Sequence, residues 1–114
     1  LPDDQKLVIE TARVIRVGFL QQNAYHKDDT YVPLDKQFKM LKIIIQLYDN
    51  CRGAVNQGVP FSKLLETGMF ERVIKMKYDI PNDKSVMDDK FTDLSVDIDQ
   101  AVKNVVKQCT EEGR

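Results

Sequence analysis

The sequence has few of the residues that build cross-linked or metal-stapled folds. Its 114 residues include 5 glycines, 4 prolines, 2 cysteines, 1 histidine and no tryptophan. Two cysteines and one histidine cannot supply the four ligands of a Cys/His zinc site, so no metal site is predicted. The longest uninterrupted aliphatic run is Ile43-Ile44-Ile45, far short of the ~20 residues that cross a membrane. No signal peptide is recognised in the sequence, so we expect free thiols and a cytoplasmic location.

The sequence also lacks an excess of charge of either sign. It carries 17 Lys and Arg against 18 Asp and Glu, a net charge of −1. This balance excludes a basic nucleic-acid binder and an acidic tail protein. No glycine-rich phosphate loop and no catalytic constellation occurs, so no catalytic residue is predicted and a self-sufficient enzyme is not expected. Because the sequence starts at Leu1 rather than at Met, we expect it to be a piece of a longer chain.

Helix-forming patterns fill most of the chain. Apolar residues recur at the 3.6-residue period, and Gly and Pro fall at the boundaries between periodic segments. The expected helices comprise one that starts near Pro2, others over about 33–57, 62–65 and 70–77, and a last one over about 83–111. No alternating run predicts a strand. The predicted fold class is all-α, an antiparallel helical bundle of three long helices plus one or two short helices, in one domain over residues 1–114.

The same periodicity predicts the core and the helix ends. The expected core residues are Ile15, Leu41, Ile45, Tyr48, Ile74, Leu94, Ile98 and Val102. Gly58 fits the C-terminal cap of the second long helix. Gly18 lies within the first apolar pattern, where it either ends the helix or admits a close neighbour.

Three groups of residues could carry chemistry, but each has a simpler explanation. His26 has no nucleophile at a recognisable spacing and reads as a hydrogen-bonded loop residue. Cys51 and Cys109 lie on apolar stripes and read as small buried hydrophobes. The acidic residues from Asp88 to Asp99 lack the glycine and the closing glutamate of a calcium loop, which favours a solvated helix face over a metal site.

Residues 19–26, with the sequence FLQQNAYH, are more informative. They place aromatic residues and three side-chain amides at a helix end. Amides can bind the edge of a purine, and an aromatic ring can stack on its face. Alternatively, Phe19 and Tyr25 belong to the core and the amides cap the helix. The residue types alone leave both interpretations open.

These residues resemble a known family, the C-terminal helical domain of the catalytic A (alpha) subunit of V-type and A-type rotary ATPases. The matching segments are residues 19–26, Asp29-Thr30-Tyr31, residues 36–41, Gly58-Val59-Pro60 and Met76-Lys77-Tyr78. The start of the chain also resembles the acidic helix-turn-helix that touches the rotating shaft in F-type beta subunits. The family usually has Phe where this sequence has Tyr25.

The resemblance implies roles for particular residues. Tyr25 would stack on adenine, Gln22 and Asn23 would line its edge together with Ala24, and Phe19 would pack behind. Asp3 and Asp4 would contact the rotor. The site residues implied for nucleotide binding are thus Phe19, Gln22, Asn23, Ala24 and Tyr25.

The resemblance also implies cofactors and partners. ATP or ADP with magnesium would bind the full-length subunit, and none is expected in this chain alone. The implied partners are B subunits in an alternating hexameric ring and the central stalk, with the membrane touched only through the complex. Proton or sodium specificity and the direction of catalysis lie beyond this sequence. The alternative is a stand-alone helical-bundle interaction module without a nucleotide role.

Overall fold

The computed structural model describes residues 1–21 and 31–112, and these residues are almost entirely helical. The elements are α1 (Asp3–Arg13), the π-helix η1 (Val14–Leu20), α2 (Leu34–Asn56), α3 (Phe61–Leu65), α4 (Met69–Asp79) and α5 (Lys84–Glu112). No strand occurs in this part of the chain, and the predicted all-α class is confirmed. The observed helix bounds agree with the expected ones to within about two residues.

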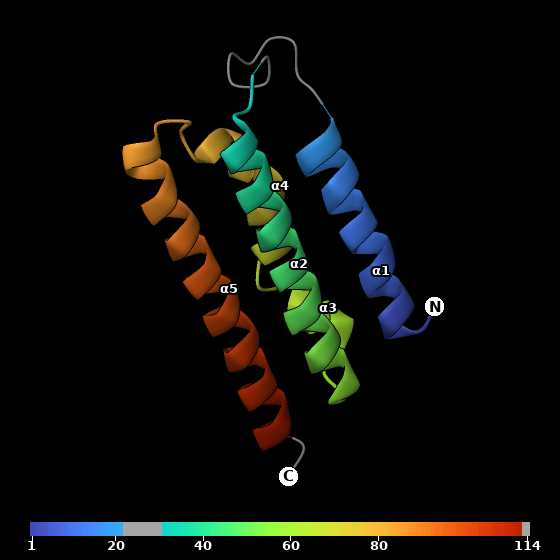
Figure 1. The fold of residues 1–114 in the computed structure, drawn as a ribbon. Helices are drawn as coiled ribbons and strands as arrows, with labels where there is room; N and C mark the ends of the chain where they lie inside the picture. The colour runs from blue at the N-terminus through green and yellow to red at the C-terminus, as the bar shows by residue number, and fades with distance from the viewer. Residues whose placement is uncertain (22–30, 113–114) are drawn as a thin grey trace.

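The long helices form two pairs (Figure 1). The helices within each pair are parallel, and the two pairs run in opposite directions. α1 with η1 lies beside α4 and runs in the same direction, whereas α2 and α5 lie side by side and run the other way. Polar contacts establish that α2 and α5 are parallel, because Lys39 pairs with Asp88 and Gln46 donates to the Ser95 carbonyl at the same sequence offset of 49. The predicted antiparallel order therefore holds between α1 and α2 but not between α2 and α5. The reason is α4, which is long enough to carry the chain back between them.

The core is a single cluster shared by all the helices. α2 contributes Met40, Ile43, Ile44, Leu47, Cys51 and Ala54, and α5 contributes Met87, Phe91, Leu94, Ile98 and Val102. The predictions for Leu94, Ile98 and Val102 are confirmed. Ile15, Tyr48 and Ile74 are half-buried at the edge of this cluster.

The predictions for Leu41 and Ile45 are wrong. These side chains are 39% and 58% exposed, whereas Ile44 is only 4% exposed. α2 has a second apolar stripe, formed by Leu34, Phe38, Leu41 and Ile45, which we call the outward stripe. It lies on the side of the helix opposite the core face, so the helical period fits both sides. Periodicity alone could not decide which stripe is inside.

Gly18 marks the closest approach between two helices. A Cβ atom at this position would lie 2.9 Å from the Ile74 Cα and 3.2 Å from its carbonyl oxygen. Only glycine allows the backbones of η1 and α4 to approach this closely. Of the two alternatives, a close neighbour is therefore the correct one. The helix continues to Leu20, and the Gln21 N–H donates to the Arg16 carbonyl, 2.9 Å away and five residues earlier.

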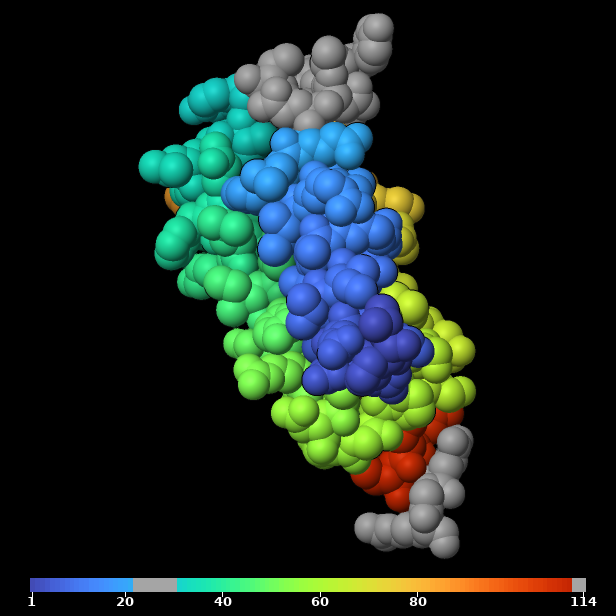
Figure 2. All heavy atoms as spheres, turned by 90° about the vertical axis from the view of Figure 1, so that its right-hand side faces the viewer, coloured from blue at the N-terminus to red at the C-terminus, as the bar shows by residue number. Residues whose placement is uncertain are grey.

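Gly58 ends α2 as predicted. Its φ of 94° is left-handed, and its N–H donates to the Val55 carbonyl at 2.9 Å. The Val59 N–H donates to the Ala54 carbonyl at 3.1 Å, which completes a Schellman motif. The turn brings α3 beside the start of α1. Figure 2 shows α1 and η1 along one face, with α2 on one side and the α3–α4 segment on the other.

Candidate functional site

Of the sequence-predicted site residues, the structure describes Phe19 near the end of η1 and Asp3 and Asp4 at the start of α1. Phe19, near the end of η1, is half-buried and packs against the core. Gln22, Asn23, Ala24, Tyr25 and also His26 lie outside the described residues. The end of η1 and the start of α2 are at one end of the molecule, the start of α1 lies further along the bundle, and α5 ends at the far end (Figure 1).

A buried lysine binds the chain where η1 ends. Lys77, on α4, is only 4% exposed. Its Nζ donates a hydrogen bond to the Gln21 carbonyl oxygen at 2.9 Å. This hydrogen bond holds the backbone of Gln21 against α4.

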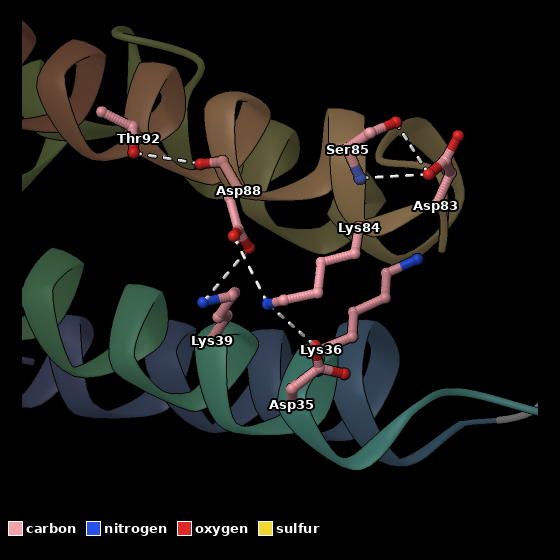
Figure 3. Close-up of polar contacts among 8 residues, drawn as sticks. All are labelled: Asp35, Lys36, Lys39, Asp83, Lys84, Ser85, Asp88 and Thr92. Carbon is pink, nitrogen blue, oxygen red and sulfur yellow. Dashed lines mark hydrogen bonds and ion pairs between the residues drawn. The ribbon is translucent and has the colours of Figure 1, made fainter.

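A second buried lysine lies at the start of α2. Lys36 is completely buried, and its Nζ donates to the Lys77 carbonyl at 2.8 Å, the Ile80 carbonyl at 2.6 Å and Asn82 Oδ1 at 2.7 Å. The carbonyls of Lys77 and Ile80 belong to the end of α4, where a positive charge complements the helix dipole. Figure 3 shows the Lys36 side chain extending away from the ion pairs between α2 and α5.

Side-chain amides hold the backbone that follows the 22–30 connection. Asn82 donates through Nδ2 to the Tyr31 carbonyl at 3.2 Å, and Gln37 donates through Nε2 to the Val32 carbonyl at 2.9 Å. Because Asn82 also accepts a hydrogen bond from Lys36, one chain of contacts joins Gln21, Lys77, Lys36, Asn82 and Tyr31. We call the three side chains of Lys36, Lys77 and Asn82 the lysine clamp.

Neither lysine of the clamp was predicted to be buried, although a sequence pattern for both exists. Lys36 precedes the buried residues Met40 and Ile43 at spacings of four and seven, and Lys77 follows Val73 at a spacing of four. A lysine in phase with the core stripe is a candidate for a buried cation.

The acidic residues of α5 make specific contacts as well as facing solvent (Figure 3). Lys84 Nζ lies 3.4 Å from Asp88 and 3.6 Å from Asp35, and Lys39 Nζ lies 3.4 Å from Asp88. Desolvation alone would raise the pKa of Asp88, but the two lysines outweigh it and hold the pKa below its usual value. Among the described residues, no three His, Cys, Asp or Glu side chains are grouped closely enough to hold a metal ion.

At the start of α1, the predicted rotor residues differ from each other. Asp3 Oδ2 accepts a hydrogen bond from the Phe61 N–H at 3.1 Å, and Oδ1 lies 3.7 Å from Lys6 Nζ. Asp3 therefore joins α1 to the first turn of α3. Asp4 is exposed, and its Oδ1 accepts a bond from the Gln5 N–H at 2.9 Å. Of the two carboxylates, Asp4 is the more available to another protein.

Open grooves follow the contact between α2 and α5. One, of about 480 Å³, is lined by residues that include Asn50, Gly53 and Asp99, and another, of about 450 Å³, by residues that include Lys42, Gln46 and Phe91. Neither contains a sequence-predicted site residue. No helix in the described ranges is both long enough and apolar enough to cross a membrane.

Comparison with known proteins identifies the family. Residues 1–65 match the family model described as the C-terminal domain of V and A type ATP synthase. The chain belongs to this family. The match includes α1, η1, α2 and the 22–30 connection, so the resemblance noted on residues 19–26 is confirmed at the level of the family.

Individual relatives extend the similarity over most of the chain. The V-type ATP synthase alpha chain 2 of Clostridium tetani is 58% identical over 83 residues, which are 73% of this chain and 14% of that protein. The V-type ATP synthase alpha chain of Halothermothrix orenii is 45% identical over 100 residues, 88% of this chain and 16% of that protein. The A subunit of the A-type ATP synthase of Methanopyrus kandleri is 36% identical over 110 residues, 96% of this chain and 18% of that protein. The chain thus spans less than a fifth of the length of these relatives.

Proposed function

We propose that this chain is the C-terminal domain of the catalytic A subunit of a V/A-type rotary ATPase. The observation that carries the proposal is the family match over residues 1–65, which contains the FLQQNAYH segment. The chain spans only 14% of its Clostridium tetani relative, which leaves room for a nucleotide-binding domain elsewhere in the complete subunit. That domain would bind ATP or ADP with magnesium and carry out phosphoryl transfer to water.

In this proposal the domain completes the adenine pocket. Tyr25 stacks on the base, Gln22 and Asn23 line its edge beside Ala24, and Phe19 supports the pocket from behind. The half-buried position of Phe19 at the end of η1 fits a supporting role. Stacking of a base on an aromatic side chain contributes ~1–3 kcal/mol in known sites.

The domain also transmits closure around the nucleotide to the rotor. The helical segment formed by α1 and η1 covers 18 residues and has Asp3 and Asp4 at its start and Phe19 near its end. At 1.5 Å per residue it is roughly 27 Å long. A continuous helical segment packed against α2 and α4 suits the transfer of a rigid-body movement between these ends.

The assembly that the proposal requires has further parts. B subunits alternate with A subunits in a hexameric ring around a central stalk, and the complex transports protons or sodium ions. The domain itself would be cytoplasmic and touch the membrane only through the complex. By itself the chain would be inactive, since it has no phosphate-binding loop.

The experiment that tests the proposal is the Tyr25→Ala substitution in the full-length catalytic subunit, measured in the assembled ATPase. We expect nucleotide binding to weaken by ~1–3 kcal/mol, similarly for ATP and ADP because both carry the same base. The Michaelis constant should rise more than turnover falls. Tyr25→Phe is the matched control and should be nearly silent, because the stacking face remains. If Tyr25→Ala unfolds the domain without affecting affinity, the aromatic residue belongs to the core and the proposed pocket is wrong.

A further inference from the structure

Buried lysines are rare because removing an ammonium group from water is costly unless hydrogen bonds replace the water. Two of them, Lys36 and Lys77, meet here at one point of a small domain. The acceptors of their Nζ atoms include main-chain carbonyls: Gln21 for Lys77, and Lys77 and Ile80 for Lys36. These bonds therefore fix the backbone at the end of η1 and at the end of α4.

We propose that the lysine clamp is a positioning device for the nucleotide site. Lys77 holds the chain where it enters the 22–30 connection, at Gln21, and Asn82 holds it where it returns, at Tyr31. Lys36 joins these two anchors, because its Nζ donates both to the Lys77 carbonyl and to Asn82 Oδ1. The inference rests on the proposed function, since it is the adenine pocket that the clamp positions.

The clamp acts on the nucleotide indirectly. Lys36 has no exposed surface, and the acceptors of its Nζ include two main-chain carbonyls and Asn82 Oδ1, all within 2.8 Å. Lys77 is also buried and directs its Nζ to Gln21. Neither charge is available to a phosphate in solution. Their contribution is to hold both ends of the connection against the last turn of α4, and a displacement of about 1 Å at a binding group is enough to reduce function strongly.

The first test is the Lys77→Met substitution in the full-length catalytic subunit, measured in the assembled ATPase. Methionine keeps an unbranched apolar side chain but cannot donate to Gln21. The Michaelis constant for ATP should rise about 3- to 30-fold, and turnover should change less than about twofold. This rise is smaller than the largest effect expected from removing the stacking ring in Tyr25→Ala. The matched control is Lys75→Met, an exposed lysine on the same helix, which should leave both constants unchanged. An unchanged Michaelis constant in folded Lys77→Met would overturn the proposal.

A milder variant keeps the test decisive if Lys77→Met fails to fold. Asn82→Asp keeps Oδ1 as the acceptor for Lys36 but removes the Nδ2 donor to Tyr31. We expect a smaller rise of the Michaelis constant in the same direction, about two- to fivefold. A folded Asn82→Asp variant with unchanged nucleotide affinity would argue against the clamp.

Amide hydrogen exchange without nucleotide separates this inference from the proposed function. Exchange at Gln21 in the Lys77→Met variant, and at residues 31 and 32 in the Asn82→Asp variant, should be about tenfold faster than in the parent. Faster exchange with a normal Michaelis constant would mean that the clamp exists but does not position the pocket, which contradicts the inference. If Tyr25→Ala also leaves affinity unchanged, the proposed function fails as well. If Tyr25→Ala weakens binding while both clamp variants bind normally, only the clamp inference fails.

Discussion

The two sides of α2 have almost the same composition and opposite environments. The inward side carries Met40, Ile43, Ile44, Leu47 and Cys51, each at most 4% exposed. The outward stripe carries Leu34, Phe38, Leu41 and Ile45, which are between 39% and 80% exposed. Hydrophobic side chains at helical spacing therefore establish that a segment is a helix, but they do not establish which side is buried.

A third, polar side of α2 lies between these two stripes. Lys39, Gln46 and Asn50 face α5, where they contact Asp88, Ser95 and Asp99. This polar side lies against α5, and the inward stripe beside it is the one that joins the shared core. Ridges of α2 on the inward side meet α4 and α5 across the shared core.

The two sides of α2 should differ most in how much stability is lost when a side chain is shortened. A cavity on the inward side should lower the free energy of unfolding the most. Leu47 is 2% exposed, and Leu47→Ala should lower the free energy of unfolding of the 114-residue chain by about 2–5 kcal/mol. Ile45→Ala, on the outward stripe, is the matched control and should change it by no more than about 0.5 kcal/mol. Urea denaturation followed by circular dichroism measures both values. Equal losses in the two variants would mean that the outward stripe is covered in solution.

A chemical probe gives a second contrast, between Cys51 on the inward side and Cys109 near the end of α5. Desolvation by burial raises the pKa of the Cys51 thiol to about 12, so almost no thiolate is present at about pH 8. Cys109 is only half-buried. We expect iodoacetamide to modify Cys51 at least about 100-fold more slowly than Cys109, measured by mass spectrometry of the peptides. In urea, where the chain unfolds, the difference should disappear. Comparable rates in the folded protein would mean that the inward side opens readily.

The sequence was sufficient for features that depend on neighbouring residues. Helix bounds followed from periodicity, the end of α2 followed from Gly58, and the close contact at Gly18 was one of two stated alternatives. Each of these depends on local backbone geometry, which a residue type restricts directly.

Features that depend on distant residues were less accessible. The burial of Ile44 rather than Ile45, and the parallel direction of α2 and α5, result from the way that α4 returns the chain. The burial of Lys36 was not predicted, because its acceptors at Lys77, Ile80 and Asn82 are more than 40 positions away in the sequence. The expected pocket residues came from family resemblance, since amides and aromatics at a helix end are compatible with capping as well as with base binding.

The smallest expected effect concerns the polar side of α2, where Asp88 meets Lys39 and Lys84. Although desolvation acts to raise the pKa of Asp88, the lysines lower it below its usual value in the folded chain. A carboxyl group with a lowered folded pKa stabilises the fold above its unfolded pKa, and this stabilisation is lost as the pH falls through the folded pKa. The thermal midpoint of the parent should therefore decrease below about pH 4, and part of this decrease should be absent in Asp88→Asn. Asp89→Asn is the matched control, an exposed neighbour on the same helix. If the parent and Asp88→Asn lose stability equally between about pH 5 and pH 3, these ion pairs do not help to hold the polar side of α2 against α5.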